Sequence, residues 1–279
     1  QAAVLQEKVD LFTGCRVLDY GCAKAPTLKK VVMNNPDIEP FLFDVTDKYL
    51  TFWEQFPNQA KYALFQPDNS WKDSMDVVLS FYALEHIADL NEAINNIKSL
   101  LKVGGVFYFI VPNVYANIAD FIVADHINHF SKNSLTWLLS KEGFEDIIVD
   151  DQVHDAAFVV TAKLSEKVEL IPVEVNKQEI SECYNLSWEM AGYWKEVLER
   201  ILLFEKGMGD NSVVAIYGAG FYGHFIASSL SGLEKLCCFV DQNKFLHGLK
   251  IDDKPVLLPE ELPNEVTHLL IGLNPRIAR

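Results

Sequence analysis

VLDYGCAKA, at residues 17–25, holds an apolar run, an acid and a glycine in that order. The apolar run is typical of a buried strand, and Gly21 follows it at the strand's carboxyl end, where open α/β sheets bind ligands. A glycine there lets a ligand approach the backbone closely. Ala23 and Ala25 stand where a dinucleotide-binding turn has its later glycines, so a ligand-binding turn and an ordinary structural turn both remain open.

Strand-like and helix-like segments alternate outward from this turn through the first half of the chain. The alternation predicts an open α/β sheet, and the last two strand segments, which only a polar turn separates, predict an antiparallel pair. Apolar residues at helical spacing predict helices over 89–101 and 131–141. The strand segments are residues 15–20, 39–45, 75–82, 103–113, 145–149 and 156–164.

An acid also ends the second strand segment. Asp44 lies about 20 residues beyond the first turn. A carboxylate at this place can accept hydrogen bonds from both hydroxyls of a ribose. The alternative is that Asp44 is an ordinary turn residue whose carboxylate is solvated.

Two further motifs follow, DVVLSFYALEHI at residues 76–87 and LLKVGGVFYFIVPN at 100–113. With the first two, they resemble a class I S-adenosylmethionine-dependent methyltransferase over residues 1–165. The resemblance implies S-adenosylmethionine as cofactor and assigns eight residues to it. Asp19, Gly21 and Cys22 would lie near the methionine, Asp44 at the ribose, Gln66 or Asp68 at the adenine, and Ser80 and Phe81 along the floor.

The segment ADHINHFSKNSLTWLLSKEGFE, at residues 124–145, extends the resemblance to the sugar C-methyltransferase group, without that group's N-terminal zinc-binding module. The resemblance makes His126 the expected base, with Asp125 and His129 as alternatives, because an imidazole can remove a proton near neutral pH. The alternative is that Asp125 and His126 are loop residues whose side chains only form hydrogen bonds with the backbone of the turn. Asn113 and Tyr115 are expected to face the acceptor, whereas Glu85 and His86 are expected to cap and pack a helix.

A second glycine-rich turn, GAGFYG at residues 218–223, is a full G-x-G-x-x-G, and Asp241 lies 18 residues beyond Gly223. Alone it indicates NAD, but only about 60 residues remain from Gly218 onward, about one half of a dinucleotide-binding fold. We therefore expect Gly218, Gly220, Gly223 and Asp241 to hold a nucleotide-linked substrate. A stabilising or dimerising domain with an unused turn is the alternative.

Composition excludes several classes of partner. The chain has 24 Lys and Arg against 39 Asp and Glu, a net charge of −15, which disfavours nucleic acids and acidic lipid surfaces. Its five cysteines form no CxxC pair, so neither a disulfide framework nor a metal site is expected, and a reducing cytoplasm fits. No apolar run is long enough to span a membrane, and the first ten residues lack the apolar stretch of a signal peptide.

These observations predict an α/β protein in three parts. A Rossmann-like class I methyltransferase domain covers residues 1–165, a long helical connector 166–210, and a smaller Rossmann-like half domain 211–279. A start at Gln1 and an end soon after a strand-like run are also compatible with a fragment of a longer protein. The expected function is methyl transfer from S-adenosylmethionine to a small molecule, a nucleotide-linked sugar or a related metabolite. An NAD-dependent sugar-modifying enzyme and a non-catalytic assembly partner are the rivals. The acceptor, the methylated atom and assembly into homo-oligomers stay open.

Overall fold

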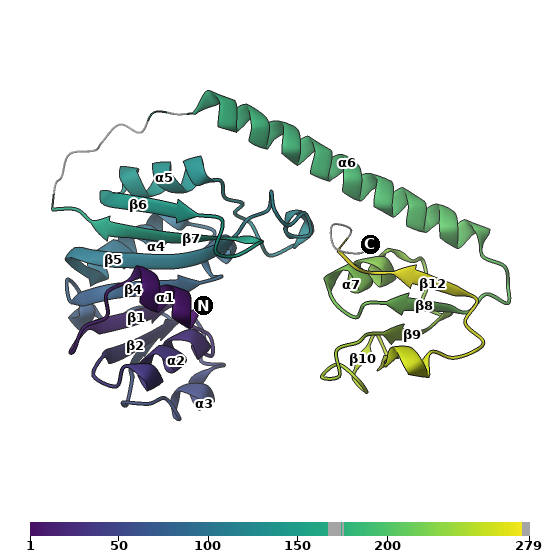
Figure 1. Ribbon diagram of the computed structural model, residues 1–279, viewed down its shortest axis with the longest axis horizontal. Helices are drawn as coiled ribbons and strands as arrows, with labels where there is room; N and C mark the ends of the chain where they lie inside the picture. The colour runs from purple at the N-terminus through teal and green to yellow at the C-terminus, as the bar shows by residue number, and fades with distance from the viewer. Residues whose placement is uncertain (167–173, 175, 275–279) are drawn as a thin grey trace. The chain divides into compact units, whose positions relative to one another are not determined.

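The computed structural model describes residues 1–166, 174 and 176–274. The chain divides into two compact units, Gln1–Tyr184 and Asn185–Arg279, which we describe separately (Figure 1). Residues 167–173 and 175 of the predicted connector, and 275–279 of the predicted last domain, lie outside the described residues.

A seven-stranded mixed sheet forms the centre of the first unit. Its strand order is β3-β2-β1-β4-β5-β7-β6, in which β1 to β5 run parallel and β7 runs antiparallel to both of its neighbours. The open α/β sheet and the antiparallel final pair are therefore confirmed. The strands are β1 (Arg16–Tyr20), β2 (Glu39–Asp44), β3 (Lys61–Leu64), β4 (Met75–Phe81), β5 (Leu101–Pro112), β6 (Phe144–Asp150) and β7 (Ala157–Leu164).

Both faces of this sheet are buried, because apolar side chains alternate across it. One core includes Leu18 and Phe107 and receives apolar residues of α4 (Leu90–Leu100) and α5 (Lys132–Lys141). The other includes Val17 and Tyr108 and receives those of α1 and α2. The remaining helices of the unit are α1 (Ala2–Lys8), α2 (Pro26–Asn34), α3 (Leu50–Trp53) and three short 3-10 helices, η1 (Asn69–Trp71), η2 (Leu84–His86) and η3 (Asp120–Ile122).

Side-chain caps fix where the two predicted helices begin. The carboxylate of Asp89 accepts a hydrogen bond from the backbone N–H of Glu92, and α4 starts there. Ser131 and Ser134 form a reciprocal capping box at the start of α5. Since α4 joins β4 to β5 and packs on the sheet, it keeps the carboxyl ends of β1, β2, β4 and β5 at one edge.

The second unit contains a five-stranded sheet with the order β10-β11-β9-β8-β12. All neighbours run parallel except β10 and β11. The long helix α6 (Lys177–Gly207) begins in the first unit, and most of it belongs to the second. The ring of its Trp194 packs against that of Phe225 in α7, with the ring centroids 4.8 Å apart. The other elements are α7 (Phe221–Ser229), η4 (Pro259–Glu261), β8 (Val214–Tyr217), β9 (Leu236–Val240), β10 (Lys250–Ile251), β11 (Lys254–Leu257) and β12 (His268–Ile271).

Two composition-based expectations can be compared with the fold. None of the five cysteines, all of which lie among the described residues, is joined in a disulfide. Within the described part of the chain, no helix has both the length and the apolar character needed to cross a membrane.

Candidate active site

A cavity of about 980 Å³ opens at the carboxyl ends of β1 to β4. Four of the predicted cofactor residues, Gly21, Asp44, Gln66 and Asp68, line this cavity. Other lining residues were not assigned to the cofactor from the sequence; they include Tyr49, Lys72, Tyr82, His86, Asp89 and Glu92. A volume of this size is at the upper end of the range for small-molecule sites.

The turn after β1 packs closely against the segment that follows β4. Gly21 has φ +72°, and a Cβ there would lie 2.9 Å from the Cβ of Ala83, so a larger residue would push the β1 turn away from the exit of β4. Ala23 and Ala25 also adopt left-handed conformations, at φ +46° and +48°, which cost alanine about 1–2 kcal/mol each. The alanines thus take the conformation that glycines usually supply in such turns.

Hydrogen bonds hold Ala23 in this conformation. Its N–H donates to Oδ2 of Asp44 at 2.8 Å, and its carbonyl accepts from the indole of Trp53 at 2.7 Å. Oδ1 of Asp44 accepts from the N–H of Thr46 at 3.2 Å. Asp44 is buried but lines the cavity, and each of its oxygens retains a lone pair for a further donor.

Asp19 and Cys22 lie beneath the turn and do not line the cavity. Asp19 is 1% exposed, and its Oδ1 has no hydrogen-bond partner among the described residues. Burial, followed by the charge of Asp44, raises the pKa of Asp19 to about 8. Burial also raises the pKa of the Cys22 thiol, which therefore stays protonated.

Ser80 and Phe81, the predicted floor, lie at the end of β4, and neither lines the cavity. Ser80 is fully buried, and its hydroxyl donates to the carbonyl of Tyr20 at 3.0 Å, which joins the ends of β4 and β1. The ring of Phe81 lies 6.0 Å from that of Tyr108. Both residues therefore support the cavity from behind.

Asn113 and Tyr115 follow β5, as predicted, outside the cavity lining. The side-chain oxygen of Asn113 accepts from the N–H of Tyr115 at 3.1 Å, and Asn113 is nearly buried. This bond shapes the backbone just after β5. Residues 120–129, which follow, are called the acceptor loop.

His126 lies on the acceptor loop and has a buried acidic partner, Asp120. Nδ1 of His126 lies 2.7 Å from Oδ1 of Asp120. The neighbouring Asp125 is exposed and lies instead against His86, with Oδ2 3.4 Å from Nδ1 of that ring. His129 is exposed, and its Nε2 lies 3.3 Å from the carbonyl oxygen of Asp120. Asp120 gave no signal in the sequence because it belongs to no motif.

Asn128 fastens the acceptor loop to the exit of β4. Its side-chain amide donates to the carbonyls of Leu84 and Ile87 at 3.1 and 2.7 Å, and its N–H donates to the carbonyl of Glu85 at 3.1 Å. These three bonds bring His126 beside Glu85 and His86 of η2. The rings of His86 and His126 meet edge to face, with centroids 4.7 Å apart.

Glu85 does not cap a helix, contrary to the expectation. Ala83 is the N-cap of η2 and makes no side-chain capping bond, and Asp89 caps α4. The Glu85 carboxylate is 1% exposed and has no hydrogen-bond partner among the described residues. Burial raises its pKa, although its own backbone N–H and the two histidines act in the opposite direction.

The second glycine-rich turn is tightly packed. Gly218 has φ +103°, and a Cβ on Gly223 would lie 1.9 Å from the carbonyl oxygen of Gly218. Gly220 is exposed and begins α7. Oδ2 of Asp241 accepts from the N–H of Ala219 at 2.8 Å, so the carboxylate occupies one of the turn's amides.

A family model described as a methyltransferase domain matches residues 2–149, just over half of the chain. The chain belongs to this methyltransferase family. S-adenosylmethionine is accordingly its cofactor. No curated protein matches the chain.

Three solved structures similar to this methyltransferase can be compared with it. The CurJ carbon methyltransferase is 15% identical, with a TM-score of 0.46, over 58% of this chain and 51% of its own. An S-adenosylmethionine-dependent methyltransferase from Archaeoglobus fulgidus is 18% identical, with a TM-score of 0.48, over 58% and 92%. The phosphoethanolamine N-methyltransferase 2 of Haemonchus contortus, in complex with S-adenosylmethionine, is 15% identical, with a TM-score of 0.48, over 59% and 52%. This methyltransferase therefore spans about half the length of the first and the third.

The cavity of this methyltransferase fits a cofactor made of a nucleoside joined to an amino acid. The carboxylate of Asp44 can still accept hydroxyl hydrogen bonds, and Gly21, which has no side chain, lines the cavity beside it. Apolar groups such as Phe65 and Ala93 line the cavity beside these polar groups. Mixed apolar and polar walls are typical of nucleoside sites.

Proposed function

We propose that this methyltransferase methylates a small-molecule acceptor, a nucleotide-linked sugar, and that His126 takes up the acceptor's proton. One observation carries the proposal: the buried carboxylate of Asp120 holds Nδ1 of His126 at 2.7 Å. This contact fixes the ring and its tautomer and leaves the lone pair of Nε2 for a proton. His126 adjoins His86, whose side chain is part of the cofactor cavity.

In this proposal the cofactor residues have separate tasks. Asp44 accepts the ribose hydroxyls, Gln66 or Asp68 reaches the adenine edge, and the turn at Gly21 carries the methionine portion. Asp19 and Cys22 support that turn, while Ser80 and Phe81 brace it from the end of β4. The support for this assignment is that four of these residues line one cavity.

S-adenosylmethionine supplies a methyl group on a positively charged sulfur, which needs no further activation. The protein's residues are therefore left with alignment of the acceptor and removal of its proton. We assign alignment to Asn113 and Tyr115 after β5, and proton removal to His126. Asp125 and His129 are exposed and are the weaker alternatives for the base.

The sugar-nucleotide acceptor is supported by the second unit. If the short antiparallel strand β10 is left out of the count, the parallel strands β11, β9, β8 and β12 have the order 3-2-1-4, as in the first part of a nucleotide-binding α/β fold. A single such half suits one nucleotide better than NAD, so we propose that Gly218, Gly220, Gly223 and Asp241 contact a nucleotide-linked acceptor. We also propose a cytoplasmic location, which five cysteines without a disulfide support.

Transfer of an isotopically labelled methyl group tests the proposal. The purified chain is incubated with labelled S-adenosylmethionine and a panel of nucleotide-linked sugars, and products are identified by mass spectrometry. We expect label in at least one sugar and a turnover about 10²- to 10⁴-fold lower for His126→Asn. Equal turnover by the parent and the variant would contradict the role of His126.

Thermal unfolding separates this function from its two rivals. A ligand that binds only the native state raises the unfolding temperature by mass action. We expect stabilisation by S-adenosylhomocysteine and by a nucleotide-linked sugar. Reduction of NAD with any sugar of the panel would favour the NAD-dependent enzyme, and stabilisation by S-adenosylhomocysteine without turnover of any acceptor would favour the assembly partner.

A further inference from the structure

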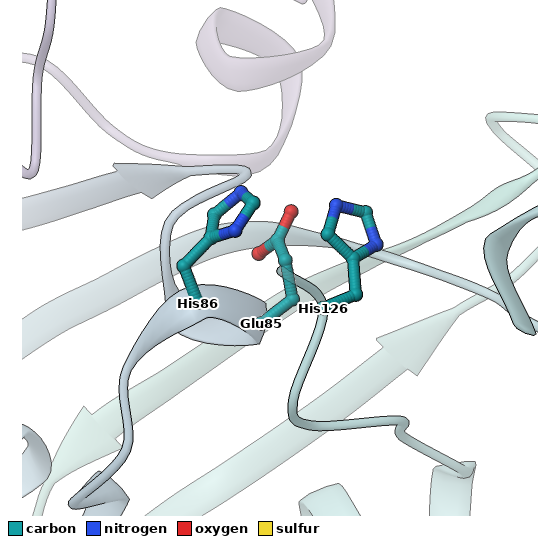
Figure 2. A group of neighbouring side chains, drawn as sticks. All are labelled: Glu85, His86 and His126. Atoms are coloured by element: carbon teal, nitrogen blue, oxygen red, sulfur yellow. The ribbon is translucent and has the colours of Figure 1, made fainter. Parts of the chain in front are cut away.

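We propose that Glu85, His86 and His126 bind one divalent transition-metal ion beside the cofactor cavity. One ligand atom from each residue lies within 4.8 Å of the other two. Figure 2 shows the carboxylate of Glu85 between the two imidazole rings, with Glu85 and His86 on η2 and His126 on the acceptor loop. We expected no metal site from the sequence, in which His126 lies about 40 positions beyond the adjacent Glu85 and His86.

The state of Glu85 is the first argument for a cation. Its side chain is 1% exposed, and neither oxygen has a hydrogen-bond partner among the residues that the structure describes. An isolated carboxylate is costly to bury, and native proteins pair such groups with cations or bind metals through them. No lysine or arginine forms an ion pair with Glu85 in the described part of the chain.

The surroundings of the histidines are the second argument. Asp120 holds Nδ1 of His126 at 2.7 Å. Nδ1 of His86 lies 3.0 Å from the carbonyl oxygen of Asp125 and 3.4 Å from its carboxylate. Histidines that bind metals almost always donate their other ring N–H to a carboxylate or carbonyl, which fixes the tautomer and makes the remaining nitrogen more basic.

The third argument is preorganisation. The three hydrogen bonds of Asn128 join the acceptor loop to η2, so two segments that are distant in sequence present their ligands together. Metal–ligand bonds of about 2.0–2.2 Å require ligand atoms slightly closer than those here. Because the side chain of His86 is exposed, it is free to move closer to the other two ligands.

The donor set indicates the class of metal. Two imidazole nitrogens and one carboxylate suit Zn²⁺, Co²⁺, Fe²⁺ or Mn²⁺ and leave coordination positions open, whereas Mg²⁺ and Ca²⁺ prefer oxygen ligands. An acceptor oxygen at an open position would lose its proton to solvent more easily. This consequence rests on the proposed function, since His126 would then act through the metal rather than as the free base. Metal binding itself does not depend on it.

Cobalt is a suitable probe because its absorption reports coordination by nitrogen. The full chain is treated with a chelator, dialysed and titrated with Co²⁺ and, separately, Zn²⁺, by absorption and calorimetry. We expect one ion per chain, with a visible absorption band for Co²⁺. We further expect at least about tenfold weaker binding for Glu85→Gln and His126→Ala, and a loss of about 10- to 100-fold for Asp120→Asn.

A matched control removes a histidine outside the cluster. His247 pairs with Glu261 in the second unit, so His247→Ala should bind Co²⁺ like the parent. Equal affinity of the parent and Glu85→Gln would overturn the proposal, as would the absence of metal uptake by the parent. Circular dichroism and S-adenosylhomocysteine binding by each variant establish that it is folded.

The two proposals fail in different ways. A chain that binds S-adenosylhomocysteine and methylates an acceptor at full rate after chelation refutes the metal site and leaves the proposed function standing. A chain that binds one Co²⁺ through Glu85 but labels no acceptor refutes the proposed function and leaves the metal site standing. Activity that chelation abolishes and Co²⁺ or Zn²⁺ restores supports both.

Discussion

Oδ2 of Asp44 lies 2.8 Å from the backbone nitrogen of Ala23, and this hydrogen bond joins the end of β2 to the turn after β1. The second unit repeats the relationship, because Oδ2 of Asp241 lies 2.8 Å from the nitrogen of Ala219. In both units an acid at the end of the second strand holds the turn that follows the first. Only the acid of the first unit lines the described cavity.

Asp44→Asn tests the assignment of the ribose. The change removes the negative charge while keeping an oxygen acceptor, so a charge-assisted interaction worth about 1.5–3 kcal/mol is lost. We expect the affinity for S-adenosylhomocysteine, measured by calorimetry, to fall at least about tenfold. Asp241→Asn makes the same change at the equivalent place and should leave this affinity unaltered. Equal affinities for Asp44→Asn and the parent would remove Asp44 from the cofactor site.

Asp19 should make stability depend on pH. Its pKa is about 8 in the folded chain, against 3.8 as the ordinary value, so the folded chain keeps a proton that the unfolded chain loses between these values. The contribution of Asp19 to the free energy of unfolding is therefore largest below about pH 4. It falls as the pH rises and levels off above about pH 8. Asp19→Asn removes the dependence.

Urea unfolding at pH 5, 7 and 9 measures this effect. The free energy of unfolding of Asp19→Asn, relative to the parent, should increase with pH by more than about 1 kcal/mol. Asp125→Asn, on an exposed carboxylate, is the control and should show no such trend. A difference between Asp19→Asn and the parent that stays constant with pH would mean that Asp19 is ionised in the folded chain.

The two acids near His126 should differ in their effects. Asp120→Asn removes the buried carboxylate that holds Nδ1 of His126, so we expect methyl transfer to slow at least about tenfold with unchanged cofactor affinity. Asp125→Asn alters an exposed side chain that does not contact His126, and its effect should be severalfold smaller. Steady-state kinetics of both variants measure these effects, and a larger loss for Asp125→Asn would contradict the role of Asp120 and favour Asp125 as the base.

Substitution by alanine should destabilise the second unit more at Gly223 than at Gly220. A Cβ on Gly223 meets the carbonyl oxygen of Gly218 at 1.9 Å, whereas one on Gly220 meets nothing within 4 Å. We expect Gly223→Ala to destabilise the second unit by about 1–3 kcal/mol or more, and Gly220→Ala by less than about 1 kcal/mol. Hydrogen exchange of the β8 and β12 amides measures both changes, and similar protection in the two variants would contradict the packing argument.

The sequence predicted the fold well where local signals and burial agreed. Strands with apolar residues on both faces, such as β4, and helices with side-chain caps, such as α4, appear within a few residues of the expected bounds. The prediction missed β3, whose residues Lys61–Leu64 are exposed or only half-buried at the sheet edge. An edge strand of four residues carries little hydrophobic pattern, so pairing with β2 determines it.

The candidate site was less predictable because its contacts are long-range. Residues that follow strands, such as Gly21 and Asp44, could be found, since topology alone brings the carboxyl ends of parallel strands together. The partner of His126 could not, because Asp120 belongs to no motif and only the course of the acceptor loop brings it to Nδ1. The proximity of Glu85 and His86 to His126 could not be found either, since about 40 positions separate η2 from His126.

The clamp that Asn128 makes on η2 has a thermodynamic consequence. His86 belongs both to the cluster with Glu85 and His126 and to the lining of the cofactor cavity, so the two sites share one side chain of η2. Whatever shifts η2 on one side changes the free energy of occupancy on the other. Such coupling is reciprocal, so each ligand alters the affinity for the other by the same factor.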